Sequence, residues 1–213
     1  MSDLASTPLA QALGDLEEER AVLLVSDKLA KGEPALNVLE ELQAGMNIVG
    51  ERFEAGEYFL SELIYAADIF KKASAPLQAG LSQVAPLTCG TLVLGTVKND
   101  IHDFGKDIVA TVMRSNGLKV IDLGVNVDYG RFVEAIREHQ PQLVGLSCLL
   151  TTAFEDMRKT IETIAEAGLR DRVTILIGGG PVDEATRDYV GADYYCRSAQ
   201  EGVSTAKRVL GVS

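Results

Sequence analysis

The chain has 213 residues, 46% of them hydrophobic, so it is long enough for one large or two small domains with a buried core. Its formal net charge of -11 disfavours nucleic acid and anionic lipid as partners, because both require clustered Lys and Arg. No run of about 18 apolar residues could span a bilayer, and residues 1–10 do not resemble a signal peptide. We therefore expect a cytoplasmic protein, away from membranes, whose partners are proteins or small molecules.

The amino-terminal part of the chain has helical periodicity. Thr7 and Pro8 suit the N-cap and first turn of a helix, and leucines at helical spacing follow, which predicts one helix over residues 8–31. Residues 32–34, Gly-Glu-Pro, interrupt this pattern. Apolar residues then recur at steps of three and four over residues 36–53, which predicts a strongly amphipathic second helix.

Gly56 ends the second helix, and apolar residues from Leu60 to Leu77 predict a third. We expect residues 1–83 to form an all-helical bundle with short connections. Residues 82–86 are the natural linker to the rest of the chain, and we expect a hinge there.

From Thr88 onward, short apolar runs alternate with amphipathic segments. This alternation predicts an α/β domain over residues 88–213, with a doubly wound, five-stranded parallel sheet that is Rossmann-like and flavodoxin-like in order. Ligands of such sheets bind beyond the carboxyl ends of the strands. The expected strands are 91–97, 119–123, 143–147, 173–177 and 193–196, and the expected helices are 104–116, 129–138, 153–167, 182–190 and one after Gln200.

The three cysteines, Cys89, Cys148 and Cys196, are far apart in the sequence and odd in number. They predict neither a disulfide framework nor a CxxC metal site. Each lies in an apolar, strand-like segment, so we expect three buried thiols.

The loop after the first expected strand contains a histidine. Neutral imidazole is a good transition-metal ligand, and Asp100, two residues before His102, could hold the other ring nitrogen. Gly105 would let a bulky group approach the backbone. Asp103 could cap the helix that follows, and we also expect it among the cofactor-binding residues. Lys106, in the first turn of that helix, is expected to extend along the surface into solvent.

A single histidine does not hold a bare metal ion firmly, and no second His, Cys or carboxylate cluster lies nearby at ligand spacing. A metal bound at His102 should therefore arrive inside a macrocycle that supplies its other ligands. Haem and a corrinoid both fit this requirement.

The residues Asp100-x-His102-x-x-Gly105 resemble the DxHxxG motif of cobalamin-binding domains. These domains occur in methionine synthase, in the corrinoid proteins of methanol, methylamine, glycine betaine and aryl ether demethylation, and in some mutases. The resemblance implies a base-off cobalamin with His102 as the axial ligand of cobalt, and a groove for the nucleotide tail. The residues that match this groove are Ser147, Leu149, Thr151, Gly178, Gly179 and Gly180; the glycines would equally suit a strand-to-helix turn or a phosphate cradle.

Residues 45–60, GMNIVGERFEAGEYFL, resemble the helical cap module of methionine synthase and of the methyltransferase corrinoid proteins. The resemblance places Met46, Phe53 and Leu60 near the cofactor, with Phe53 and Leu60 as shields of its methyl face, although both would also suit the core of the bundle. One position departs from methionine synthase: its relay serine is Ala153 here, which leaves Thr151 or Thr152 as substitutes.

The resemblance implies a methyl carrier that cycles between cob(I)amide and methylcob(III)amide and is not catalytic alone. Its partners would be a substrate-specific methyltransferase, a second methyltransferase that uses tetrahydrofolate or coenzyme M, and a reductive activase. Two alternatives are a cobalamin sensor and the small subunit of an adenosylcobalamin mutase. The absence of a DNA-binding segment before Leu9 disfavours the first, and the cap disfavours the second.

Overall fold

The structure is a computed structural model that describes residues 4–77 and 88–212. It divides into two compact units, one made of Met1–Leu87 with Ser115–Gly117 and the other of Thr88–Arg114 with Leu118–Ser213. The linker and hinge expected over residues 82–86 lie outside the described residues. Within the described ranges, no helix is long and apolar enough to cross a membrane.

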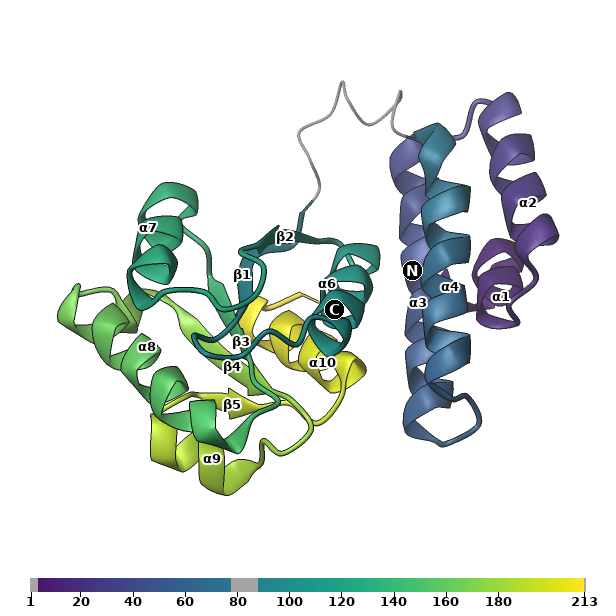
Figure 1. The fold of residues 1–213 in the computed structure, drawn as a ribbon. Coiled ribbons are helices and arrows are strands. Elements are labelled where there is room, and N and C mark those ends of the chain that lie inside the picture. The colour runs from purple at the N-terminus through teal and green to yellow at the C-terminus, as the bar shows by residue number, and fades with distance from the viewer. Residues whose placement is uncertain (1–3, 78–87, 213) are drawn as a thin grey trace. The chain divides into compact units, whose positions relative to one another are not determined.

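The first unit is a helical bundle, as predicted (Figure 1). Helices α1 and α3 approach each other closely, because a Cβ on Gly45 of α3 would lie 2.8 Å from the Leu13 Cβ of α1. A Cβ on Gly14 would likewise lie 2.9 Å from Ile48, so the two glycines permit this packing. The helices are α1 (Pro8–Gly14), α2 (Glu18–Ala30), α3 (Ala35–Glu54) and α4 (Leu60–Ser74).

The single helix predicted over residues 8–31 is wrong, because α1 ends at Gly14 and Leu16 adopts a φ of 62° before α2 begins. The Gly14 carbonyl accepts hydrogen bonds from Arg52 Nη1 at 2.7 Å and from the Tyr58 hydroxyl at 2.8 Å. These donors lie at the end of α3 and in the loop after it. The break is therefore stabilised by tertiary contacts, which the leucine spacing of residues 8–31 does not indicate.

The second unit contains a parallel sheet of order β2-β1-β3-β4-β5, which confirms the predicted α/β class and the flavodoxin-like order. Each strand end differs from its predicted position by one residue at most. Strands β1 and β3 are largely buried because helices cover both faces of the sheet. The strands are β1 (Gly90–Thr96), β2 (Leu118–Asp122), β3 (Leu143–Ser147), β4 (Thr174–Gly178) and β5 (Tyr194–Tyr195).

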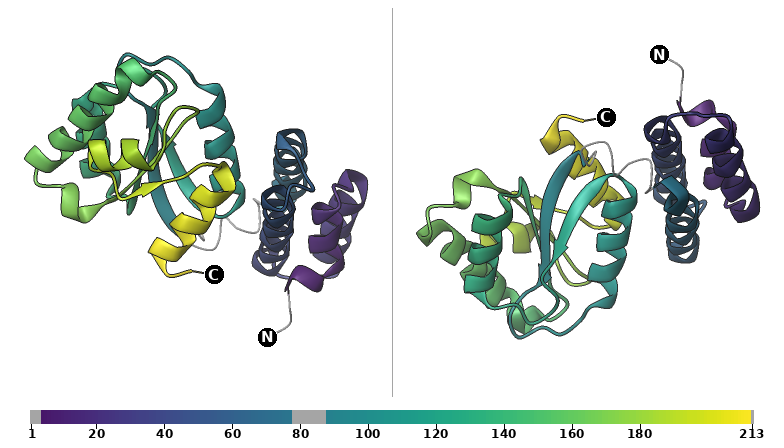
Figure 2. Two further views of the ribbon diagram at one scale, coloured as in Figure 1. Left: turned by 90° about the horizontal axis from the view of Figure 1, so that it is seen from below. Right: turned by 90° about the horizontal axis from the view of Figure 1, so that it is seen from above.

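Helices α6 (Phe104–Ser115) and α10 (Ala199–Leu210) cover one face of the sheet (Figure 2). Helices α7 (Tyr129–His139), α8 (Phe154–Glu166) and α9 (Glu184–Val190) cover the other. Right-handed crossovers explain this division, since the chain moves one way from β1 to β2 and the opposite way from β2 to β5. A core cluster that includes Phe132 and Met157 fills the space beneath α7 and α8.

The prediction of three buried thiols holds only for Cys148, since Cys89 and Cys196 are partly exposed. Cys89 precedes the first residue of β1, and Cys196 follows β5, the short edge strand, so neither is covered on both sides. Burial raises the pKa of Cys148 to about 12 and that of Cys196 to about 11. Both are therefore neutral thiols near pH 7.

Candidate functional site

The loops after β1 and β3 begin side by side at the point where the strand order reverses. The sheet register pairs Thr96 with Ser147, and the Val97 N–H donates to the Ser147 carbonyl at 3.1 Å. The chain leaves β1 towards β2 and leaves β3 towards β4, on opposite sides. Flavodoxin-like sheets bind ligands at this switch point, and here it contains the His102 loop.

Asp100 is fully buried and joins these two loops. Its Oδ1 accepts from the His102 N–H at 3.0 Å and lies 2.6 Å from His102 Nδ1. Its Oδ2 accepts from the N–H groups of Leu149 at 2.5 Å and Leu150 at 3.2 Å. Burial alone would raise the pKa of Asp100, but hydrogen bonds from Leu149, His102 and Leu150 hold it below its usual range. Asp100 is thus an ionised acceptor.

The His102 imidazole offers one nitrogen to a ligand. A carboxylate can only accept, so in the neutral form of the ring Nδ1 carries the proton and Nε2 keeps its lone pair. The side chain is 47% exposed, and Nε2 has no hydrogen bond to any of the residues that the structure describes. The Thr96 hydroxyl donates to the His102 carbonyl at 2.8 Å, which fixes the backbone of the loop. This is the geometry of a metal-ligating histidine oriented by a carboxylate.

The surroundings of His102 fit a broad, apolar cofactor. A Cβ on Gly105 would meet no atom within 4 Å, so the packing of the chain itself does not require glycine there. Ile101 and Phe104 are 71% and 67% exposed on either side of His102, although large apolar side chains are usually buried. Val125, Leu149 and Leu150 add exposed apolar surface from the neighbouring loops.

Residues 4–77 and 88–212 contain no group of three or more His, Cys, Asp or Glu side chains that could hold a metal ion. A metal at His102 would therefore need most of its ligands from a macrocycle. The open space at Gly105 and the exposed apolar side chains are consistent with such a group.

The relay hydroxyl is absent. Ala153 is buried, and Thr151 and Thr152 are exposed and make no side-chain hydrogen bond within the described part of the chain. The backbone N–H groups of Leu149 and Leu150 donate to Asp100 Oδ2, the oxygen that does not contact His102. Neither threonine thus substitutes for the serine.

The glycine run after β4 has a reason within the fold. Gly179 has a φ of 143°, and a Cβ there would lie 1.8 Å from the Cys148 carbonyl oxygen, so no other residue fits. Gly178 and Gly180 are less constrained, with nearest Cβ distances of 3.1 Å and 3.0 Å. The half-buried Ser147 hydroxyl has no hydrogen bond among the described residues, which leaves it available to a ligand.

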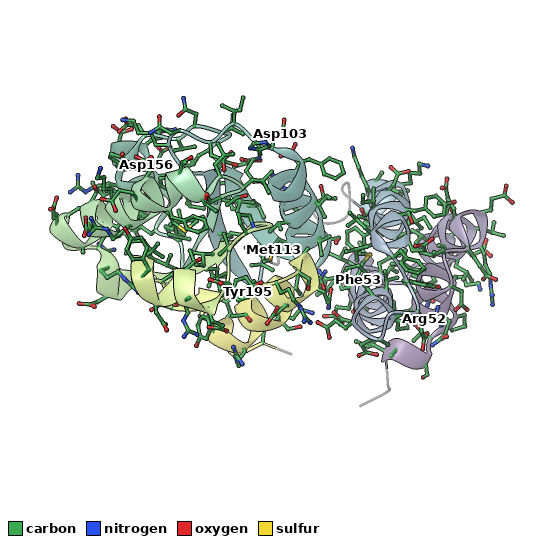
Figure 3. The ribbon with its side chains drawn as sticks, turned by 60° about the horizontal axis from the view of Figure 1, so that its bottom comes forward. Arg52, Phe53, Asp103, Met113, Asp156 and Tyr195 are labelled. Atoms are coloured by element: carbon green, nitrogen blue, oxygen red, sulfur yellow. The ribbon has the colours of Figure 1, made fainter. Side chains whose placement is uncertain are left out.

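The cap residues named from the sequence divide into two environments. Met46 is buried in the core of the bundle, which favours a packing role. Leu60 is 42% exposed and Phe53 is half-buried, so neither is an ordinary core residue. Figure 3 shows Phe53 beside Arg52 on α3, and the Arg52 guanidinium donates to the Tyr58 hydroxyl at 2.7 Å. This bond ties the end of α3 to the turn that leads to Leu60.

Two predictions about the first turn of α6 are wrong. Lys106 is only 3% exposed, and its ammonium lies 2.6 Å from both Asp107 and Asp122. Burial alone would lower the pKa of Lys106, but these two carboxylates raise it. The Asp103 carbonyl accepts the Asp107 N–H at 2.8 Å, yet its carboxylate makes no hydrogen bond among the described residues and so does not cap the helix.

Sequence reasoning missed a set of polar residues that support the His102 loop. Asn99 and Asn126 have φ values of 64° and 50°. The Asn99 N–H donates to Asn126 Oδ1 at 2.8 Å, and the Asn126 N–H donates to the Asp100 carbonyl at 2.8 Å. Asparagine in a loop signals a left-handed conformation, but the partners cannot be read from it. Asp156 and Tyr129 carried no sequence signal.

The fold and the site together define an α/β cofactor-binding protein. Two families described as B12 binding domain match the chain, one over residues 90–207 and the other over residues 6–78. The dimethylamine corrinoid protein 3 of Methanosarcina acetivorans is 38% identical over 202 residues, which cover 95% of each chain. The trimethylamine corrinoid protein of Methanosarcina barkeri is 38% identical over 207 residues, which cover 95% of this chain and 94% of that one.

A solved structure agrees with these relatives. The crystal structure of a cobalamin-binding protein from Desulfitobacterium hafniense DCB-2 has a TM-score of 0.84 and 37% identity, covering 98% of this chain and 99% of that one. The chain belongs to the cobalamin-binding corrinoid proteins. Its cofactor is cobalamin or a related corrinoid, which decides between the two macrocycles that the sequence left open and confirms the resemblance seen in the DxHxxG motif and the cap.

Proposed function

We propose that the protein is a methyl carrier that holds its corrinoid base-off with His102 as the cobalt ligand. One partner methyltransferase would be specific for the methylated substrate, a second would use tetrahydrofolate or coenzyme M, and a reductive activase would restore the carrier. When bound, the corrinoid supplies the centre that accepts and releases the methyl group. The names of the dimethylamine and trimethylamine corrinoid proteins favour a methylamine as the methyl source.

The observation that carries this proposal is the orientation of His102 at the switch point of the sheet: Nδ1 is held by buried Asp100, and Nε2 makes no hydrogen bond with the described residues. Asp100 would keep the ring in one tautomer whether or not the ligand bond is made. Residues 88–213 would be the cobalamin-binding domain, and residues 1–83 the cap whose Phe53 and Leu60 cover the methyl face. Residues proposed to line the nucleotide tail are Ser147, Leu149, Thr151 and the glycines at 178–180.

The visible absorption spectrum of protein reconstituted with methylcobalamin tests the ligand. We expect a base-off, His-on spectrum for the wild type. His102→Ala should lose the His-on form, since it removes the imidazole at the switch point of the sheet. His139→Ala is the matched control, because it removes the other histidine, at the end of α7, and should leave the spectrum unchanged. Identical spectra for His102→Ala and the wild type would refute the proposal.

Gly105→Ala separates cofactor binding from stability. The new methyl group meets no protein atom within 4 Å, and alanine favours a helix over glycine by up to about 1 kcal/mol, so the apoprotein should be as stable or more stable. We expect methylcobalamin affinity to fall at least about fivefold, because a clash of about 1–3 kcal/mol would arise with the bound group. Titration followed by absorbance measures the affinity.

Gly130→Ala is the control, because Gly130 is likewise the second residue of a helix, α7, and its Cβ would meet only Asp128 Oδ1, at an ordinary contact distance of 3.9 Å. It should leave affinity unchanged. Equal affinities for Gly105→Ala and Gly130→Ala would show that the cofactor does not approach Gly105.

A further inference from the structure

A carboxylate outside the DxHxxG motif holds the His102 loop. Asp156, in the first turn of α8, is only 9% exposed. Its Oδ2 accepts from Asn99 Nδ2 at 2.9 Å, and its Oδ1 accepts from the Tyr129 hydroxyl. These three residues belong to the segments that follow β3, β1 and β2, so one buried carboxylate connects three segments at the carboxyl edge of the sheet. Figure 3 shows Asp156 and Asp103 along this same edge.

The His102 loop is therefore tethered at two consecutive residues. Asp100 bonds the N–H groups of Leu149 and Leu150, and Asn99 bonds Asp156, six residues after Leu150 in the same segment. Two adjacent tethers fix both the position and the rotation of the backbone that carries the Asp100 side chain. Hydrogen bonds of Thr96 and Asn126 restrain the same loop, and the bond from Asn99 to Asp156 adds a restraint from the segment after β3.

The Asn99 side chain is not needed for the turn itself. Asn99 has a φ of 64°, which glycine adopts more easily. A Cβ therefore adds strain at this position, and the hydrogen bond from Nδ2 to Asp156 is what the side chain contributes. That bond goes to a charged acceptor, and such bonds are among the stronger ones in proteins.

Tyr129 orients the carboxylate. Its hydroxyl donates to Asp156, a bond that raises the pKa of Tyr129 to about 12 and keeps the hydroxyl protonated. Lys98 lies 4.7 Å from the centre of the Tyr129 ring and pairs with Asp128 at 2.8 Å, which holds the ring in place. The bond from Tyr129 to Oδ1 thus leaves the other carboxylate oxygen, Oδ2, to accept from Asn99.

We infer that Asp156, held by Tyr129 and bonded to Asn99, is a positioning residue for His102 that keeps the imidazole aimed at the cobalt. This inference rests on the proposed ligation by His102. A loop held in the ligating conformation loses little conformational freedom when the bond to cobalt forms. The hydrogen bonds that join Tyr129, Asp156 and Asn99, here called the brace, therefore favour the His-on state. Without these hydrogen bonds, the loop would lose conformational freedom when His102 binds cobalt, which disfavours the His-on state.

The test is Asn99→Gly, which keeps the turn and removes the amide. With methylcobalamin bound, we expect the ratio of His-on to His-off protein in the visible spectrum to fall about tenfold, the equivalent of about 1.4 kcal/mol. In the apoprotein, hydrogen exchange at the Leu149 amide should become faster while the overall unfolding midpoint stays unchanged. Asp156→Asn should lower the ratio as well, and the double variant should lose no more than the larger single loss.

Tyr189→Phe is the matched control, because Tyr189 donates to Glu155 at 2.8 Å, also on α8, but does not reach the His102 loop. A wild-type ratio in Asn99→Gly, or an equal fall in Tyr189→Phe, would overturn the inference. If His102→Ala still abolished the His-on spectrum, the proposed ligation would stand without the brace. A wild type with no His-on form would refute both.

Discussion

Gly179→Ala is expected to destabilise the protein by at least about 3 kcal/mol, out of a total of about 5–15 kcal/mol that is typical of folded domains. The new Cβ would lie 1.8 Å from the Cys148 carbonyl oxygen, and the φ of 143° is closed to L-residues. The steric clash is with a backbone atom of Cys148, and the strain is in the backbone dihedral of residue 179. A change of side-chain rotamer therefore relieves neither. Urea unfolding of the apoprotein, followed by circular dichroism, measures the loss.

Gly180→Ala is the neighbouring control. Its Cβ would lie 3.0 Å from Leu149 Cδ1, the end of a partly exposed side chain that can move aside. We expect a change below about 1 kcal/mol. A Gly179→Ala protein as stable as Gly180→Ala would mean that the β3 and β4 loops are not packed as closely as described.

Asp100→Asn is expected to cost about 2–4 kcal/mol of stability and most of the His-on cofactor. The carboxylate accepts from backbone groups on one oxygen and from His102 on the other, whereas asparagine has a single acceptor oxygen. Its amide group would face donors on one side, and each buried donor left unpaired costs about 1–3 kcal/mol. Urea unfolding and the methylcobalamin spectrum report the two effects separately.

Asp103→Asn removes a carboxylate of the same loop that is exposed and forms no side-chain hydrogen bond with the described residues. It should change stability by less than about 0.5 kcal/mol and leave the spectrum intact. Equal behaviour of the two variants would show that loss of negative charge, rather than loss of the Asp100 hydrogen bonds, governs ligation.

Much of the fold and the centre of the site could be predicted from the sequence. The five strands and the helices between them follow from local apolar periodicity, which samples neighbouring residues only. The Asp100–His102 pair is equally local, because the two side chains meet across two positions of one loop. Gly105 is also part of this local motif, and the structure shows that the fold itself does not need it.

Other features depended on residues that are distant in sequence. The break between α1 and α2 follows from Arg52 and Tyr58, which bond the Gly14 carbonyl across 38 and 44 positions. Lys106, in α6, is buried because Asp122, at the end of β2, pairs with it. In both cases the local pattern suggested a different result, since periodicity carries no information on the partner.

The apolar patterns of the sequence predicted the layered α/β class and the helical bundle before it, and the DxHxxG motif named His102 as the candidate metal ligand. The contacts that hold the His102 loop in place come from residues distant in the sequence and are seen only in the folded protein. Asn99 and Asp156 are 57 positions apart, and Asp100 meets Leu149 across 49. Parallel strands bring the loops after β1 and β3 to one edge, and a hydrogen bond depends on atoms brought within about 3 Å, which no local pattern encodes.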